Sequence, residues 1–186
     1  MIKLPENFEL DRYGLHVRLV REEDAEFIVS IRTDSQNARF LHDTDANVEK
    51  QVEWIKQYKK REEQGIDYYF IYHKEGIPLG VYRLYNIHDG IFTTGSWVFD
   101  KLCDKSAPIL ASIIGIEVAF ENLKLEREES NDGCHVNNKK VDKANKLMGF
   151  KESGRRFDES GEWITYSLAK EDFYEARNRM LKLLGY

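Results

Sequence analysis

The sequence predicts a mixed α/β (α+β) protein with one central, mostly antiparallel sheet of six to seven strands and helices on both faces. Three observations support this. Strand-like stretches follow one another at residues 66–73, 78–87 and 91–99, with short turns between them. A strongly apolar helix is expected next, at residues 107–123, and further strand candidates come after it. Hairpins followed by a β–α–β crossover form a mixed sheet with helices on its faces.

The first third of the chain predicts one strand and two helices. Residues 15–20 alternate between apolar and polar, as in a strand with one buried face. A short helix with apolar positions 27, 28 and 31 should follow Asp24. A second helix should begin after Asn47, a good N-cap, and end at Gly65. The basic residues 59–61 complement the dipole at the end of that helix, which is sufficient to account for them.

The middle of the chain contains the hairpins and the apolar helix. Gly76 and the pair Asp89-Gly90 lie between the three strand candidates and are turn signals. The strands should therefore be sequential and antiparallel. Gly115 lies inside the helix at residues 107–123, where glycine costs about 1 kcal/mol relative to alanine. We expect it at a point of close packing.

The last third should complete the sheet. Residues 126–136 would form an unusually polar strand, and residues 139–148 a helix that Gly149 ends. Residues 157–168 carry a hairpin whose second half is a strand. An amphipathic helix with its apolar positions at 173, 176, 180 and 184 finishes the chain.

Composition narrows the class of function. The chain has 186 residues, 41% of them hydrophobic, and no linker-like tract, so we expect a single domain over residues 1–186. Its 28 basic and 33 acidic residues give a net charge of −5, which argues against nucleic-acid binding. No run approaches the roughly 20 apolar residues of a membrane span, and the N-terminus lacks an apolar signal core. We expect a cytoplasmic protein without a membrane partner. The two cysteines lack metal-ligand spacing, so no metal is expected.

Two segments connect the chain to a known family. Residues 95–100, Gly-Ser-Trp-Val-Phe-Asp, lead into the apolar helix, and residues 138–150 begin with Asn and end a short helix in Gly-Phe. With the order of elements, they resemble the GNAT acetyltransferase superfamily over residues 15–170. This resemblance implies acetyl-CoA or another short-chain acyl-CoA as co-substrate and direct transfer to an amine.

A narrower resemblance is to the GNAT branch that acylates nucleotide-linked amino-sugars for surface polysaccharides. It implies an amino-sugar as the small-molecule partner. Separately, an exposed strand near the C-terminus would support a homodimer. The segments that carry it are residues 32–34, 40–41, 51–55, 68–70, 83–85, 95–97 and 107–108.

The resemblance places the donor's diphosphate at the start of the apolar helix. Most members have a glycine-rich turn there, whereas residues 103–108 read Cys-Asp-Lys-Ser-Ala-Pro and contain no glycine. Pro108 offers no N–H, so other groups must bind the phosphates. A β-bulge, with Gly95 as its expected residue, would splay the strand for the pantetheine arm. The expected donor-binding residues are Trp97, Val98, Phe99, Lys105, Ser106, Ala107, Ile109, Asn138 and Asn145.

The chemistry needs a base and an acid. A sugar ammonium must lose a proton before it attacks, and Glu129, Asp132, His135 or a relayed water are the candidates. Many GNAT members protonate the leaving thiolate with a tyrosine at the position of Asn145. An amide hydrogen-bonds but cannot supply a proton, so Ser96, water or another tyrosine remain as acids. A backbone N–H of residues 96–99 should stabilise the thioester oxyanion.

The expected acceptor residues are basic or aromatic. An arginine can hold a diphosphate through two parallel hydrogen bonds, and an aromatic ring can stack on a base. The candidates are Arg32, His42, Trp54, Arg83 and Tyr85. Each also has a structural interpretation: Arg32 can pair with Asp34, Trp54 can cap its helix, and Tyr85 can be strand surface.

Two other functions remain open. Ribosomal-protein members of the superfamily acetylate protein N-termini, and a broad acidic groove would favour that acceptor over a sugar. The missing glycines and the missing tyrosine would also suit a catalytically silent CoA-binding module.

Overall fold

The computed structural model describes residues 2–34 and 45–186, so the predicted acceptor residue His42 lies outside the described residues. The described part forms one eight-stranded sheet in the order β1-β2-β3-β4-β5-β6-β8-β7. Its strands are β1 (Glu9–Arg12), β2 (Leu15–Leu19), β3 (Tyr68–Lys74), β4 (Ile77–His88), β5 (Ile91–Phe99), β6 (Arg127–His135), β7 (Lys151–Asp158) and β8 (Gly161–Ala169). The predicted mixed α/β class is confirmed.

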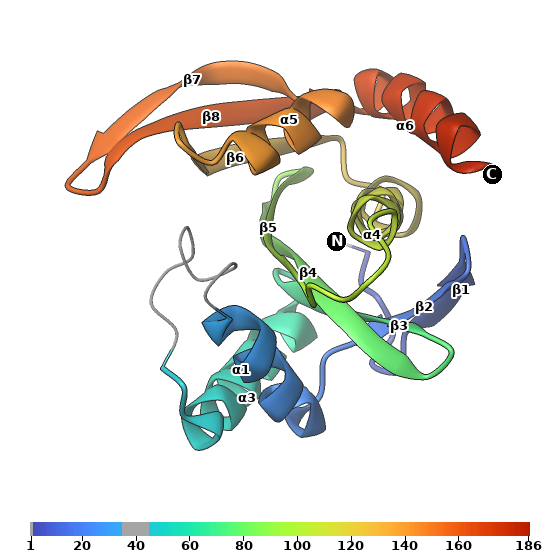
Figure 1. The fold of residues 1–186 in the computed structure, drawn as a ribbon, viewed down its shortest axis with the longest axis vertical. Coiled ribbons are helices and arrows are strands. Elements are labelled where there is room, and N and C mark those ends of the chain that lie inside the picture. The colour runs from blue at the N-terminus through green and yellow to red at the C-terminus, as the bar shows by residue number, and fades with distance from the viewer. Residues whose placement is uncertain (1, 35–44) are drawn as a thin grey trace.

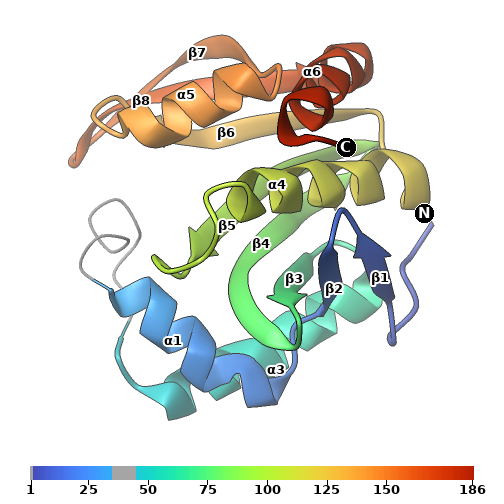
Figure 2. The same cartoon turned by 45° about the vertical axis from the view of Figure 1, so that its right-hand side comes forward.

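The helices cover both faces of the sheet, as expected (Figures 1 and 2). Those before β3 are α1 (Ala25–Thr33), which follows the 3-10 turn Glu22–Asp24, and α3 (Val48–Gln64). Those after β5 are α4 (Ala107–Glu117), α5 (Lys139–Leu147) and α6 (Lys170–Leu184). One core joins α1 and α3 to one sheet face; the other joins α4 and α6 to the opposite face.

The sheet has eight strands, where six to seven were predicted. The additional strand is β1, whose sequence Glu-Leu-Asp-Arg lacks an apolar run. The turn between β1 and β2 is formed by Tyr13 and Gly14, both with positive φ, which suits a two-residue hairpin. At the other edge, β7 begins at Lys151 rather than residue 157. As an edge strand it is mostly exposed and polar, so periodicity missed it.

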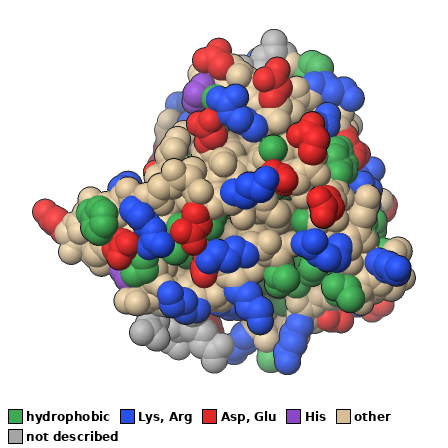
Figure 3. All heavy atoms as spheres, turned by 90° about the horizontal axis from the view of Figure 1, so that it is seen from above, with side chains coloured by type: hydrophobic (Ala, Val, Ile, Leu, Met, Phe, Trp, Pro, Cys, Tyr) green, Lys and Arg blue, Asp and Glu red, His purple; other side chains and the backbone are tan. Residues whose placement is uncertain are grey.

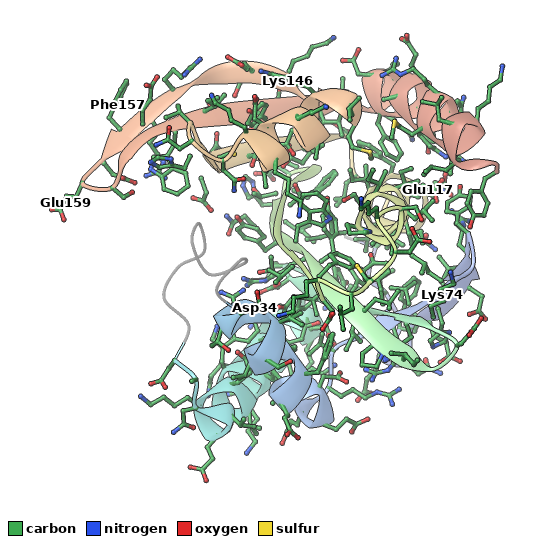
Figure 4. All side chains as sticks on the ribbon, viewed as in Figure 1. Asp34, Lys74, Glu117, Lys146, Phe157 and Glu159 are labelled. Carbon is green, nitrogen blue, oxygen red and sulfur yellow. The ribbon has the colours of Figure 1, made fainter. Side chains whose placement is uncertain are left out.

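The apolar helix is buried on all sides and continues as a π-helical turn at Val118–Asn122. Its one acidic residue, Glu117, is fully buried and accepts hydrogen bonds from Arg12 Nη1 (2.6 Å) and Tyr13 Oη (2.8 Å). Arg177 Nε of α6 lies 2.5 Å from the same carboxylate. Glu117 therefore ties the first hairpin and the last helix to α4 (Figure 4).

The surface carries charges of both signs. On the face over β7 and α6, acidic and basic side chains are interleaved (Figure 3). Phe157 and Glu159 lie at the far end of the β7–β8 hairpin (Figure 4). None of the helices in the described part of the chain has the length and apolar character needed to cross a bilayer.

Gly115 occupies the close-packing position that its sequence context predicts. A Cβ built there would lie 2.5 Å from Cδ1 of Tyr82, on β4. We predict that Gly115→Ala lowers the free energy of unfolding by about 1–3 kcal/mol, because overpacking outweighs the better helix propensity of alanine. Urea denaturation measures this change. A stabilised variant would show that helix and sheet separate easily at this contact.

Candidate active site at the strand fork

The sheet divides between β5 and β6. These strands are parallel and pair only at Ile91 with Arg127 and Phe92 with Glu128. The hydroxyl of Thr93 then donates to the carbonyl of Glu129 (2.8 Å), after which the two strands no longer pair. We call the diverging segments, residues 93–99 of β5 and 129–135 of β6, the strand fork. Figure 1 shows the two sides of the fork, with β6, β8 and β7 above it and β1–β5 below it.

A β-bulge lies on the β5 side of the fork, as predicted, but its residue is Ser96 rather than Gly95. The register between β4 and β5 shifts by one between Arg83–Gly95 and Val81–Val98. Ser96 has φ of 47°, a left-handed conformation that non-glycine residues rarely adopt. Gly95 has a different role: a Cβ there would lie 2.9 Å from the Tyr85 ring. The glycine therefore gives Tyr85 room to pass over β5.

Tyr85 bridges the two sides of the fork. From β4 its ring crosses Gly95, and its hydroxyl donates to Oδ2 of Asp132 on β6 (2.8 Å). Burial, and then the adjacent carboxylate, raise the pKa of Tyr85 above its ordinary value, so the phenol keeps its proton. The predicted catalytic Asp132 and the predicted acceptor residue Tyr85 are thus in direct contact.

The main chain of Trp97 points toward the fork. The Asp100 amide bonds the Leu79 carbonyl (2.7 Å), and Val98 is opposite Val81, so these residues use the edge facing β4. Because residues alternate along a strand, the N–H and C=O of Trp97 face the other edge. The Trp97 indole instead donates to the Pro108 carbonyl (2.9 Å) and anchors β5 to α4. Val98 and Phe99 are buried, in the α1–α3 core and the α4 core respectively.

Most of the predicted phosphate-binding amides before α4 are already hydrogen-bonded within their own loop. The Ser106 amide and hydroxyl both donate to Asp104 Oδ1 (2.9 Å each). The Ala107 amide bonds the Asp104 carbonyl, and the Ile109 amide bonds the Ser106 carbonyl. Lys105 is exposed and forms no ion pair with any described residue. A diphosphate at this loop would therefore rely mainly on the Lys105 side chain.

The two predicted asparagines lie on α5. Asn138 is the N-cap of that helix, since its Oδ1 accepts from the Val141 amide (3.3 Å). Asn145 is half-buried, and no hydrogen bond joins its side chain to β5 within the described residues. Their predicted roles toward the donor remain predictions.

The three proposed bases differ in the hydrogen bonds and ion pairs that they already make. Glu129 pairs with Arg127 Nε on the same strand (2.7 Å). His135 accepts from the Asn137 amide at Nδ1 (3.1 Å), which leaves the Nε2 proton for the Ser160 carbonyl (3.1 Å). With Nδ1 and Nε2 both engaged, this imidazole is poorly placed to take another proton. Asp132 is exposed, and of its two carboxylate oxygens only Oδ2 is hydrogen-bonded within the described chain. It is the best placed of the three.

Sequence reasoning missed Glu128, a fully buried carboxyl where the fork begins. Its Oε1 accepts from the amide (3.2 Å) and hydroxyl (3.1 Å) of Thr94 on β5, and Oε2 is buried without a partner among the described residues. Burial raises its pKa to about 8, against the opposing effect of the Thr94 hydrogen bonds. At neutral pH the carboxyl is mostly protonated, with Oε2 the oxygen left to carry the proton. A lone glutamate in a polar strand gave no signal for this.

Tyr69 is a second residue that sequence reasoning did not assign to the site. Its buried hydroxyl is hydrogen-bonded by the side chains of Arg32 and Ser96, and burial raises its pKa despite these cationic and polar neighbours. Arg32, a predicted acceptor residue, thereby contacts the phenol behind the bulge. Asp34, its expected partner, pairs with Lys101 (2.9 Å).

The remaining acceptor residues gather beside Tyr85. The Arg83 guanidinium lies 5.1 Å from the Trp54 ring centroid and 4.9 Å from that of Tyr85, within cation–π range of both. Trp54 is 37% exposed and stacks on Tyr58 within α3. Arg83 therefore contacts both Trp54 and Tyr85 on the α1–α3 side of the fork, although the three residues were predicted from separate sequence segments.

Two surface hollows lie away from the fork and contain none of the predicted site residues. One, of about 460 Å³, is lined by Leu125 and Lys170 among others; the other, of about 270 Å³, lies between α5 and α6. In the described ranges no three His, Cys, Asp or Glu side chains are grouped as metal ligands. We locate the site by the divergence of the strands.

Comparison with known proteins identifies the family. A model of the acetyltransferase (GNAT) domain matches residues 15–151, most of the chain. The chain belongs to the GNAT acetyltransferase family. It is an N-acetyltransferase, and GNAT domains use acetyl-CoA as acetyl donor. No curated protein sequence matches it.

Solved structures of other GNAT proteins are similar over nearly the whole chain. One described as "Apo FdhC- a nucleotide-linked sugar GNAT" is 29% identical with a TM-score of 0.79, over 93% of this chain and 96% of that one. RimJ of Mycobacterium smegmatis in complex with CoA-disulfide is 17% identical with a TM-score of 0.78, over 92% and 89%. The ribosomal-protein-S5-alanine acetyltransferase of Vibrio fischeri is 17% identical with a TM-score of 0.76, over 90% and 99%. The last two show the GNAT fold alone.

The protonated Glu128 makes a prediction about stability and pH. Its pKa is near 4.5 when exposed and about 8 in the folded protein, so its contribution is complete below 4.5 and is lost as pH rises through 8. The free energy of unfolding should fall by up to about 1.4 kcal/mol per pH unit in this window. Glu128→Gln should remove this component, so the free energy of unfolding of the variant should increase relative to that of the wild type as pH rises. Urea denaturation of both proteins across the window measures the difference; a constant difference would contradict the assignment.

Proposed function

We propose that this GNAT enzyme transfers an acetyl or other short acyl group from acyl-CoA to the amine of a nucleotide-linked amino-sugar. The observation that carries the acceptor class is the contact of Arg83 with the Trp54 and Tyr85 rings, together with the hydrogen bond from Tyr85 to Asp132 at the fork. An arginine against two aromatic rings, one of them bonded to a carboxylate, suits an anionic, ring-containing acceptor with an amine. The similar FdhC structure is described as a nucleotide-linked sugar GNAT, which supports the same class.

The donor would lie along the fork edge of β5. Its thioester supplies the activated acyl group, and the main chain of Trp97 offers the strand edge on which the pantetheine arm can pair. The N–H of Trp97 is then placed to stabilise negative charge on the thioester oxygen. Lys105 would contact the diphosphate. The residues present thus fit the arm of the co-substrate better than its phosphates, because the loop amides are already used.

Proton transfer from the acceptor would use the exposed carboxylate of the fork. Asp132 accepts the proton of the sugar amine at Oδ1, while Tyr85 holds Oδ2 and fixes the orientation of the carboxylate. Glu128 holds a proton at neutral pH but is fully buried, so its role is to hold β5 through Thr94. The acid that the chain lacks at Asn145 would be water, Ser96 or another tyrosine.

Thiol release from acetyl-CoA tests the acceptor class. The panel contains nucleotide-linked amino-sugars, the free amino-sugars and peptides with the N-termini of ribosomal proteins. We expect turnover with one or more nucleotide-linked sugars and at least tenfold lower kcat/KM with the free sugars, because the charged part of the acceptor contributes binding energy. Faster turnover of peptides would assign the enzyme to protein N-termini. Absence of turnover with every acceptor would favour a CoA-binding module.

Asp132→Asn tests the base. The amide keeps an acceptor for Tyr85 but cannot take a proton, so kcat should fall about 100-fold or more while KM for acetyl-CoA is unchanged. The matched control is Glu129→Gln, which removes a carboxylate from the same strand at a position paired with Arg127. Equal losses in both variants, or none in Asp132→Asn, would show that another group accepts the proton.

A further inference from the structure

Two arginines beside the fork share one buried carboxylate. The Asp67 side chain, only 2% exposed, follows α3 and precedes β3. Its Oδ1 accepts from Arg83 Nε (2.7 Å), and its Oδ2 accepts from Arg83 Nη2 (2.5 Å) and Arg61 Nε (2.8 Å). One negative charge thus faces two positive charges. The cluster keeps a net charge of about +1, since arginine does not lose its proton at any physiological pH.

Each of the two guanidinium groups keeps one nitrogen for a ligand. Arg61 uses Nη1 on the Gln57 carbonyl (3.2 Å), but its Nη2 has no acceptor in the described part of the protein. Arg83 uses Nε and Nη2, and its Nη1 is likewise without an acceptor among these residues. Neither of these two nitrogen atoms is buried, so both reach solvent. The two donors project from groups that are already fixed.

Trp54 holds this arrangement together. The guanidinium carbon of Arg61 lies 5.5 Å from its ring centroid and that of Arg83 lies 5.1 Å away. The same ring stacks on Tyr58, with the planes 7° apart. Trp54 therefore supports the arginines, and because it is 37% exposed its role toward a nucleobase stays a prediction. With the carboxylate beneath and the ring beside them, the guanidiniums lose little freedom when an anion binds.

We propose that Arg61 and Arg83 form a clamp for the two phosphate groups of the acceptor, which is therefore a nucleoside diphosphate-linked amino-sugar. This inference rests on the proposed function. Two guanidinium donors match the repeated oxygens of a diphosphate better than a single phosphate. The clamp also has the right position, because Arg83 lies against the Tyr85 ring and Tyr85 bonds Asp132. One aromatic ring separates the clamp from the proposed base, as one sugar ring separates a linked phosphate from an amine.

Arg61 and Lys60 provide a matched pair for the test. Both are basic residues near the end of α3, but exposed Lys60 bonds only Gln57 on its own helix (3.1 Å). Calorimetry would use UDP, dTDP and GDP, then the monophosphate of the base that binds most tightly. We expect the wild type to bind that diphosphate at least tenfold more tightly than the monophosphate. Arg61→Gln should abolish this difference, and Lys60→Gln should keep it.

Kinetics separate this clamp from the proposed function. With an accepted nucleotide-linked sugar, Arg61→Gln should raise its KM about tenfold and leave kcat and KM for acetyl-CoA unchanged. Arg61→Lys, which keeps the charge but loses the fork of donors, should lie between, and an unchanged KM for acetyl-CoA shows that both variants are folded. Sugar turnover with an unaltered KM in Arg61→Gln would overturn the clamp while leaving the function intact. Equal wild-type binding of diphosphate and monophosphate would also overturn it.

Discussion

The sheet divides where the side chain of one residue takes over a hydrogen bond that a neighbouring strand would otherwise make. Where β5 and β6 stop pairing, the Thr94 amide finds its acceptor in the Glu128 carboxyl instead of in a neighbouring strand. A buried amide must be satisfied, so an acceptor from a side chain allows the strands to diverge without an unpaired donor. The Ser96 bulge and the bridge from Tyr85 to Asp132 then hold the two sides at fixed positions. The proposed active site depends on this substitution.

In the proposed arrangement, the fork also separates the two substrates. Trp97 directs its main chain into the fork and its indole toward α4, whereas Arg83 and Tyr85 lie on the α1–α3 side. Donor and acceptor can thus approach one point from different faces of one sheet. Direct transfer gains most of its rate from such alignment, on the order of 7 kcal/mol when ideal. The local chemistry can then be modest, with one exposed carboxylate as the proposed base.

The sequence predicted those features that depend on local patterns, and missed those that depend on packing. Hairpins, the apolar helix and the cap residues Asn47 and Gly65 follow from spacing and turn chemistry, and all are present. The bulge was assigned to Gly95, but the structure uses Gly95 to make room for the Tyr85 ring, and Ser96 has the positive φ. Glu128 resembled the solvated acids around it, since only the tertiary structure buries it. The amides before α4 were expected to be free, but the Asp104 side chain and carbonyl engage them.

The arginines around Glu117 have a consequence for synthesis. Arg12 is synthesised before α4 and Arg177 after it, so the carboxylate can meet both cations only once α6 has been made. Until then, of these two cations, Arg12 alone can face the carboxylate, and we expect α4 to dock less firmly against the sheet. The addition of α6 therefore completes the ion pairs that join the first hairpin, α4 and α6.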